Sequence, residues 1–336
     1  MRALVLYGPG EFGVEQDWPA PRPKPGWALV RAAYSGICGS DMPRFLATGS
    51  YHHPMILGHE FAGYVEAPAP GSQRFQPGQA VAVLPLIPCG DCEGCRSGEP
   101  FHCTRYQFLG SRNDGGYAEY CLVPEDNLLP LPAGVDPLFG AFMEPLSVAL
   151  HVARRSQFTA GQSALIFGAG PIGLLIGLWL KVFGARRLVI ADVRPESIAL
   201  ALRLGFDNVV NPQETDLAGL SAFDLCIEAA GARSALLSAI DKTRHKGVLT
   251  VVGRDTKDTV LPLKSFESLM RKEISLLGCW GYNMLQDQEF VLEMLRQGRF
   301  PLEVLVTHEI SLEAAPAVIR AIGAGSMYCC KVMIKL

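Results

Sequence analysis

The sequence has little excess of either charge and no long apolar run. Its 30 Lys and Arg residues against 33 Asp and Glu residues leave a formal net charge of −3, so no strong attraction to nucleic acid or to an acidic membrane surface is expected. The longest apolar stretch, Ala164–Leu180, is broken by four glycines and a proline and falls short of the roughly 18 residues that a spanning helix needs. The opening MRALVLYGPGEFG lacks the pattern of a secretory signal. These absences predict a soluble, cytoplasmic protein.

Cysteine, by contrast, is well represented, with ten in the chain. Four of them lie in the Gly- and Pro-rich stretch PCGDCEGCRSGEPFHC, at Cys89, Cys92, Cys95 and Cys103. A reducing compartment argues against disulfides, whereas the C-x2-C-x2-C-x7-C spacing lets four thiolates converge on one ion at about 2.3 Å. Four thiolates leave no open coordination position. The group therefore predicts a structural zinc, with isolated thiols as the alternative.

The character of the chain changes near Gly140. Before it, short alternating apolar runs such as ALVLYG and WALVRAAYSGI are separated by turn residues and prolines, which is typical of a β-rich, barrel-like domain. After it, short apolar strands such as RLVIADV alternate with helical stretches, which predicts a doubly wound parallel sheet. The end of the chain adds a helix after Ser311 and a closing strand, KVMIKL. The predicted fold class is α/β, with one β-rich and one parallel-sheet domain.

A nucleotide-binding loop is predicted within ALIFGAGPIGLLIG. Gly168, Gly170 and Gly173 form G-x-G-x-x-G between an apolar strand and an apolar helix. The first glycine permits a tight turn, the second lets the backbone approach a pyrophosphate, and the third lets the helix pack on the strand. The helix would begin with Pro171 and Ile172, and backbone N–H groups at its start would hold the phosphates. Proline loses nothing at that position because its N–H would have no helical partner.

The cofactor is predicted from the end of the next strand. Asp192 closes RLVIAD, nineteen residues after Gly173. A carboxylate there hydrogen-bonds the ribose hydroxyls and repels a 2′-phosphate, so NAD is expected rather than NADP. Arg194 is the one nearby residue that would weaken the exclusion of NADP. A buried glycine-rich helix with Asp192 as a helix cap is the alternative.

A second metal set is spread over separate segments. Cys38 lies in GICGSD, His59 and Glu60 in LGHEFAG, and Glu144 in FMEPLSVALH. A thiolate, an imidazole and a carboxylate, with water in the fourth place, are typical of a catalytic zinc, which acts as a Lewis acid on an oxygen. Ser40, two residues after Cys38, is placed to accept the proton of the substrate hydroxyl.

Each of these residues also has an ordinary structural interpretation. Cys38 could be a buried thiol, His59 a hydrogen-bonded core residue, Glu144 a helix cap and Ser40 a local turn hydroxyl. A structural zinc loop and a nucleotide loop are predicted in the same chain, and this combination disfavours a separate structural explanation for each of the four residues. The residues alone leave open whether Glu60 or Glu144 is the third ligand.

Taken together, the motifs resemble the zinc-dependent medium-chain alcohol dehydrogenase family over essentially the whole chain. The segment Gly115–Tyr120 (GGYAEY) and Glu144-Pro145 add to the likeness. Within the family the chain most resembles the polyol branch, through CGSDMPRF, HPMILGHEFAGY, FLGSRNDGGYAEY and EPLSVALH. The resemblance implies a GroES-like catalytic domain at residues 1–147, completed by 290–336, and a Rossmann NAD-binding domain at residues 148–289.

The resemblance also implies ligands for two zinc ions per chain. Cys38, His59 and Glu144 would bind the catalytic zinc, with Glu60 as a competing or exchanging ligand, and the four-cysteine loop would bind the structural zinc. A homodimer or homotetramer is the assembly that the family suggests.

The predicted function is NAD- and zinc-dependent oxidation of a secondary hydroxyl in a polyol or polyol phosphate. Arg44 and Arg112 are candidates for binding a substrate phosphate, although exposed arginines are more often solvated or paired. A free polyol such as sorbitol or xylitol is the alternative substrate. A zinc-loop interaction protein or nucleotide sensor without turnover is the alternative of another class. The loop GDCEGCRSGEP has three acidic residues against one arginine, which disfavours nucleic acid.

Overall fold

The computed structural model describes residues 1–215, 217–254, 258–282 and 287–336, and the chain forms two compact units. The β-rich unit comprises Met1–Glu144 with Asn283–Leu336, and the parallel-sheet unit comprises Pro145–Tyr282. The first boundary falls in the first turn of helix α4 (Met143–Arg155). The sequence-based boundaries lie a few residues later along the chain, at 147/148 and 289/290.

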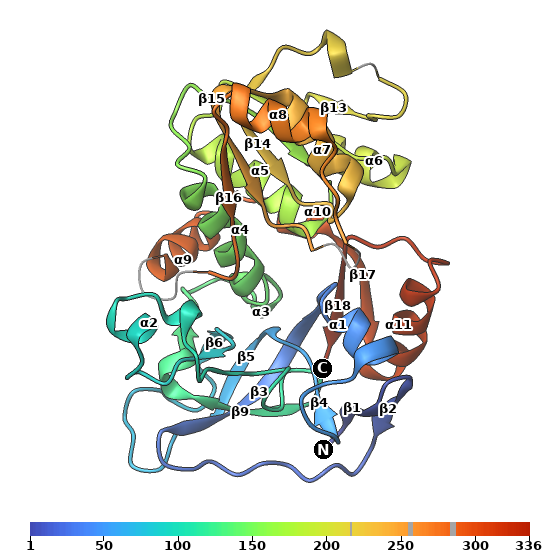
Figure 1. The fold of residues 1–336 in the computed structure, drawn as a ribbon. Helices are drawn as coiled ribbons and strands as arrows, with labels where there is room; N and C mark the ends of the chain where they lie inside the picture. The colour runs from blue at the N-terminus through green and yellow to red at the C-terminus, as the bar shows by residue number, and fades with distance from the viewer. Residues whose placement is uncertain (216, 255–257, 283–286) are drawn as a thin grey trace. The chain divides into compact units, whose positions relative to one another are not determined.

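The β-rich unit is built on a seven-stranded sheet with the order β10-β6-β5-β3-β18-β17, in which β9 also pairs with β3 (Figure 1). A three-stranded sheet, β2-β1-β4, and the pair β7-β8 accompany it. The strands are β1 (Ala3–Gly8), β2 (Glu11–Glu15), β3 (Trp27–Ile37), β4 (Met55–Ile56), β5 (Glu60–Ala67), β6 (Ala80–Val83), β7 (Leu86–Ile87), β8 (Gln107–Phe108), β9 (Tyr120–Pro124), β10 (Leu128–Pro130), β17 (Val306–Ser311) and β18 (Lys331–Lys335).

Helical segments of this unit are short and connect the strands. They are α1 (Asp41–Pro43), η1 (Arg44–Thr48), α2 (Glu93–Arg96), η2 (Pro100–His102), η3 (Glu125–Asn127), α3 (Pro137–Gly140), α9 (Gln288–Arg296), α10 (Leu302–Leu305), η5 (Leu312–Ala314) and α11 (Ala315–Gly323).

The C-terminal segment belongs to the β-rich unit because β18 pairs antiparallel with β3 and parallel with β17. One core cluster packs Val30, Phe61 and Val123 from the central strands. A second cluster includes Phe45 and Ile334. The alternation of buried and more exposed positions along β3 is the period-two pattern of a sheet with one buried face.

The parallel-sheet unit has six strands in the order β13-β12-β11-β14-β15-β16, all parallel (Figure 1). The elements are β11 (Ser163–Phe167), α5 (Pro171–Val182), β12 (Arg187–Ala191), α6 (Pro195–Arg203), β13 (Val209–Val210), η4 (Leu217–Gly219), β14 (Phe223–Glu228), α7 (Arg233–Lys242), β15 (Thr243–Val251), α8 (Leu263–Arg271) and β16 (Ser275–Gly278).

The central elements of this unit are apolar on every side. All five residues of β11 are buried, as expected of a strand covered by helices on both faces. Helix α5 is buried from Gly173 through Leu180, which explains why its sequence has no polar face. The longest apolar stretch in the chain is therefore a strand, a glycine turn and a core helix. Within the described residues, no helix combines the length and the apolar character needed to cross a membrane.

Candidate active site

The strand register brings Cys38, His59 and Glu60 together. Strand β3 ends at Ile37, immediately before Cys38, and its antiparallel neighbour β5 begins at Glu60, immediately after His59. Gly36 is paired with Glu60, so the two strand ends lie side by side. One ligand atom from each of the three residues lies within 4.8 Å of the others. A thiolate, an imidazole and a carboxylate at this separation fit a zinc ion.

Asp41 holds this group in place. Its Oδ1 lies 3.5 Å from His59 Nδ1, and its Oδ2 accepts hydrogen bonds from the Cys38 backbone N–H at 3.3 Å and the Tyr117 hydroxyl at 2.6 Å. Burial opposes a charged imidazole, but the negative charges of Asp41 and Cys38 outweigh it and hold the pKa of His59 well above its usual value. Neither Asp41 Oδ1 nor His59 Nδ1 has a hydrogen-bond partner among the described residues; a carboxylate beside Nδ1 suits a ring that offers Nε2 to a metal.

Glu60 is paired with a lysine from the end of the chain. The Nζ of Lys331 lies 2.5 Å from Glu60 Oε2, and both side chains are 2% exposed. A buried carboxylate is costly unless a charge of opposite sign compensates it. Lys331 supplies that charge, and strand β18 carries it into the site.

Glu144 lies near the group but outside the set of three. It stands in the first turn of α4 and is 8% exposed. Burial raises the pKa of Glu144 to about 7, with His59 and Lys331 lowering it and Glu60 raising it further. The hydroxyl of Ser40 lies 3.3 Å from Cys38 Sγ.

The four cysteines of the loop also converge. Their four Sγ atoms all lie within 4.8 Å of one another, in Cys89, Cys92, Cys95 and Cys103. Cys92 precedes the first residue of α2, and backbone N–H groups of Cys95 and Thr104 lower the pKa of its thiol to about 6. The thiolate that a zinc ion requires is therefore favoured at this position.

The glycine loop differs in the space it leaves at its second and third glycines. Helix α5 begins at Pro171 with Gly170 as its N-cap. A Cβ added at Gly170 would meet no described protein atom within 4 Å, whereas one added at Gly173 would collide with the carbonyl oxygen of Gly168. The first position is open to a ligand, and the second is closed by the backbone.

These two glycines give opposite predictions. Gly170→Ala is expected to leave the melting temperature unchanged and to weaken NAD binding by about tenfold or more, because the methyl group occupies the place of the phosphates. Gly173→Ala is expected to lower the melting temperature itself. Thermal unfolding and NAD titration of both variants test this, and unaltered NAD affinity in Gly170→Ala would contradict it.

Asp192 follows β12 and contacts the loop directly. Its Oδ2 accepts a hydrogen bond from the Ala169 N–H at 2.7 Å, and its Oδ1 accepts one from the Arg194 N–H at 2.9 Å. The Arg194 side chain is 56% exposed, with its Nε 3.8 Å from Asp192 Oδ1. The carboxylate therefore lies at the carboxyl ends of β11 and β12, where doubly wound sheets bind ligands.

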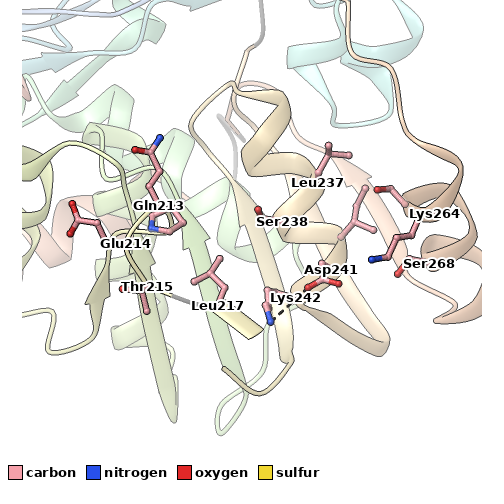
Figure 2. Close-up of a pocket in the computed structure, with 13 residues that line it drawn as sticks. Gln213, Glu214, Thr215, Leu217, Leu237, Ser238, Asp241, Lys242, Lys264 and Ser268 are labelled. Carbon is pink, nitrogen blue, oxygen red and sulfur yellow. Dashed lines mark ion pairs between the residues drawn. The ribbon is translucent and has the colours of Figure 1, made fainter. Parts of the chain in front are cut away.

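A separate hollow of about 720 Å³ lies in the parallel-sheet unit (Figure 2). Gln213 and Thr215 line it from the connection after β13, Ser238 and Lys242 from α7, and Lys264 from α8. Its described lining includes none of the predicted cofactor residues. In its described part, the connection from β13 to β14 contains the 3₁₀ turn η4 and no α-helix, so no crossover helix fills this space.

The two candidate substrate arginines differ in their surroundings. Arg44 Nη1 donates to the Ser40 carbonyl at 3.0 Å and lies 3.8 Å from Asp41 Oδ1. Arg112 instead contacts two tyrosine rings. Arg44 is therefore bonded to residues that lie next to Cys38 and His59.

Sequence reasoning missed three residues of the site: Asp41, Tyr117 and Lys331. Asp41 stands inside GICGSD, next to Ser40, and Tyr117 stands inside the family motif GGYAEY. Lys331 had one local signal, because it is a charged residue at the start of the apolar strand KVMIKL. No local signal could have paired it with Glu60, which is 271 residues away.

Comparison with known proteins is consistent with this geometry. Residues 24–133 match the alcohol dehydrogenase GroES-like domain, and residues 171–297 match the zinc-binding dehydrogenase domain. Galactitol 1-phosphate 5-dehydrogenase of Escherichia coli (strain K12) is 35% identical to the chain over 309 residues, 89% of each protein. The chain belongs to the zinc-dependent medium-chain alcohol dehydrogenase family.

Other relatives in this dehydrogenase family include L-idonate 5-dehydrogenase (NAD(P)(+)) of the same strain, 36% identical over 267 residues and 76% of each protein. The crystal structure of galactitol-1-phosphate dehydrogenase from Escherichia coli matches all of both chains with a TM-score of 0.93 at 33% identity. The predicted family, its polyol branch and the GroES-like plus Rossmann fold are confirmed. The motif stretches in the sequence indicate galactitol-1-phosphate 5-dehydrogenase in particular, and that likeness is confirmed too.

Proposed function

We propose that the protein oxidises a secondary hydroxyl of a polyol or polyol phosphate, of the galactitol 1-phosphate type, to a ketone with hydride transfer to NAD. The observation that carries the proposal is the convergence of Cys38, His59 and Glu60 within 4.8 Å in a member of a zinc-dependent dehydrogenase family. The names of the relatives support a small polyol-like substrate. A homodimer or homotetramer is the assembly proposed.

Two zinc ions per chain are proposed. Cys38, His59 and Glu144 would hold the catalytic ion, with Glu60 as a competing or exchanging ligand, and the four-cysteine loop would hold the structural ion. Support for this division comes from Lys331, which pairs with one carboxylate oxygen of Glu60. When bound, the catalytic zinc would supply a Lewis acid for the substrate hydroxyl and NAD would accept the hydride.

The residues around the centre have separate tasks. Asp41 orients His59 through Nδ1. The Ser40 hydroxyl, 3.3 Å from Cys38 Sγ, would receive the proton of the substrate hydroxyl. Gly168, Gly170 and Gly173, with Pro171 and Ile172 at the start of α5, would hold the pyrophosphate through backbone N–H groups.

We propose that Asp192 sets the preference for NAD over NADP. Arg194 is the nearby residue that could pair with the 2′-phosphate of NADP and so weaken this preference. Because Asp192 also accepts the Ala169 N–H, Asp192→Asn is a cleaner change than alanine: it removes the charge and keeps an acceptor. The variant is expected to raise the NADP-to-NAD ratio of kcat/KM by about tenfold, as a repulsive charge is lost. Asp207→Asn, an exposed aspartate of the same unit, is the control. An unchanged ratio in Asp192→Asn would mean that the ribose is held elsewhere.

The proposed activity is tested by NADH formation with zinc-loaded protein. Galactitol 1-phosphate is compared with galactitol, sorbitol and xylitol, and zinc is counted by metal analysis. Turnover of a polyol or its phosphate, with two zinc ions per chain, is the expected result. Binding of zinc and NAD without turnover of any of the four would instead favour a protein that senses nucleotide or binds partners.

A further inference from the structure

The guanidinium of Arg112 packs against two aromatic rings. Its Cζ lies 3.9 Å from the ring centroid of Tyr51 and 4.5 Å from that of Tyr106. Within residues 1–215, 217–254, 258–282 and 287–336, no carboxylate oxygen lies within 4.0 Å of its guanidinium nitrogens. Its Nε is buried and donates no hydrogen bond to a described residue. Because Nε is enclosed by protein, an acceptor from outside the chain would have to pair with the terminal nitrogens Nη1 and Nη2 of this half-buried side chain.

The tyrosine that contacts it is fixed by the residues on each side. Ser50 Oγ donates to the Ser111 carbonyl at 2.8 Å, and His52 Nε2 donates to the Arg112 carbonyl at 3.2 Å. Tyr51 lies between these two bonds. Two segments some 60 residues apart are thus joined so that the Tyr51 ring rests against the guanidinium.

The same group of side chains reaches the candidate zinc ligands. The Arg112 backbone N–H donates to the Phe108 carbonyl at 2.8 Å. The Phe108 ring contacts the His59 ring edge-on at 5.8 Å between centroids, and the Tyr106 ring at 6.5 Å. A row of rings therefore leads from His59 through Phe108 and Tyr106 to the guanidinium. All of these residues belong to the β-rich unit.

This arrangement suits a phosphate monoester. Aromatic contacts use the faces of a guanidinium, while its five N–H donors lie in its plane and match phosphate oxygens in pairs. Arg44, by contrast, already donates to the Ser40 carbonyl and pairs with Asp41. In a substrate oxidised at carbon 5 and phosphorylated at carbon 1, most of the carbon chain separates the reacting hydroxyl from the phosphate. The anionic end therefore needs a cation set apart from the metal, as Arg112 is.

We infer that Arg112, held by Tyr51 and Tyr106, binds a phosphate monoester at the end of the substrate and selects the phosphorylated polyol over the free polyol. This inference rests on the proposed dehydrogenase function and adds a specificity-determining residue to it.

The test compares kcat/KM for galactitol 1-phosphate and galactitol in Arg112→Gln, Arg112→Lys and the unchanged protein. Arg112→Gln is expected to reduce kcat/KM for the ester by about 10- to 100-fold, the worth of a charge-assisted pair, and to leave that for galactitol within about twofold. Arg112→Lys keeps the charge but not the paired donors, so an intermediate loss is expected. Arg31→Gln is the matched control, because Arg31 also lies against a tyrosine ring, 5.0 Å from that of Tyr64, but pairs with Glu66. In this variant kcat/KM should stay unchanged for both galactitol 1-phosphate and galactitol.

A binding measurement separates this inference from the proposed function. Calorimetric titration with galactitol 1-phosphate and with galactitol needs no turnover. The ester is expected to bind at least tenfold more tightly than the free polyol, and Arg112→Gln should remove the difference. If no polyol is oxidised but this difference is found and lost in the variant, the proposed function fails while Arg112 remains the residue that binds the phosphate ester. Equal losses for both substrates, or no preference for the ester in the unchanged protein, would overturn the inference.

Discussion

The Cys38→Ser variant is expected to lose turnover by about 10³-fold or more while it binds NAD as the unchanged protein does. A serine hydroxyl is a far weaker zinc ligand than a thiolate, and a Lewis acid on the reacting oxygen is worth several kcal/mol of transition-state stabilisation. Cys38 lies in the β-rich unit and the glycine loop in the parallel-sheet unit, so the nucleotide residues are untouched. Zinc content should fall from the proposed two ions per chain to one.

The matched control is the Cys329→Ser variant. Cys329 is half-buried and lies outside both groups of thiols, so this variant should keep the zinc content and the turnover of the unchanged protein. Steady-state kinetics, NAD titration and metal analysis on both variants give the comparison. Equal loss of turnover and NAD binding in Cys38→Ser would place Cys38 in the structure of the chain rather than in its chemistry. Retained turnover would remove it from the metal site.

Cys92→Ser is expected to have the opposite profile, with a large loss of stability. The stretch from Cys89 to Cys103 contains only the short helical segments α2 and η2, so the proposed zinc, held by four thiolates, would be its main source of order. Loss of a structural metal is among the large destabilising changes. At about 2–4 °C per kcal/mol for a unit of this size, the melting temperature should fall by about 5–10 °C.

Cys38→Ser and Cys92→Ser serve as controls for each other. Each should retain one zinc, but the first should lose activity at nearly normal stability and the second should lose stability while keeping measurable activity at low temperature. Thermal unfolding with and without a chelator measures the difference. If Cys92→Ser unfolds at the temperature of the unchanged protein, the loop is not held by a metal.

Much of the fold could be predicted because its signals are local. The apolar runs WALVRAAYSGI and ALIF mark the positions of β3 and β11. Glycine spacing and an apolar helix give the turn between β11 and α5. The described part of the connection from β13 to β14 contains no α-helix, and the segment after NVV has no periodic apolar pattern that would predict one.

The candidate site was predicted less evenly. The four cysteines are close in sequence, so their spacing alone predicts their convergence. Cys38 and His59 could be paired only through the motifs, because their proximity depends on the register between β3 and β5. The choice between Glu60 and Glu144 was left open by the sequence. In the structure both carboxylates are buried near His59, and the charge of Lys331 acts on both: it pairs with Glu60 and lowers the pKa of Glu144.

The sequence by itself determined the two-part fold, the four-cysteine loop, the glycine loop and the acidic residue at the end of the second parallel strand. Each of these depends on short-range spacing, which fixes geometry within one turn or one strand. Only the tertiary structure decided that Asp41 lies beside His59, that Lys331 pairs with Glu60, and that, among the described residues, Arg44 has an acidic partner and Arg112 has none. Those facts depend on burial and on contacts between distant segments, and a charge acquires its partner or lacks one only when the chain has folded around it.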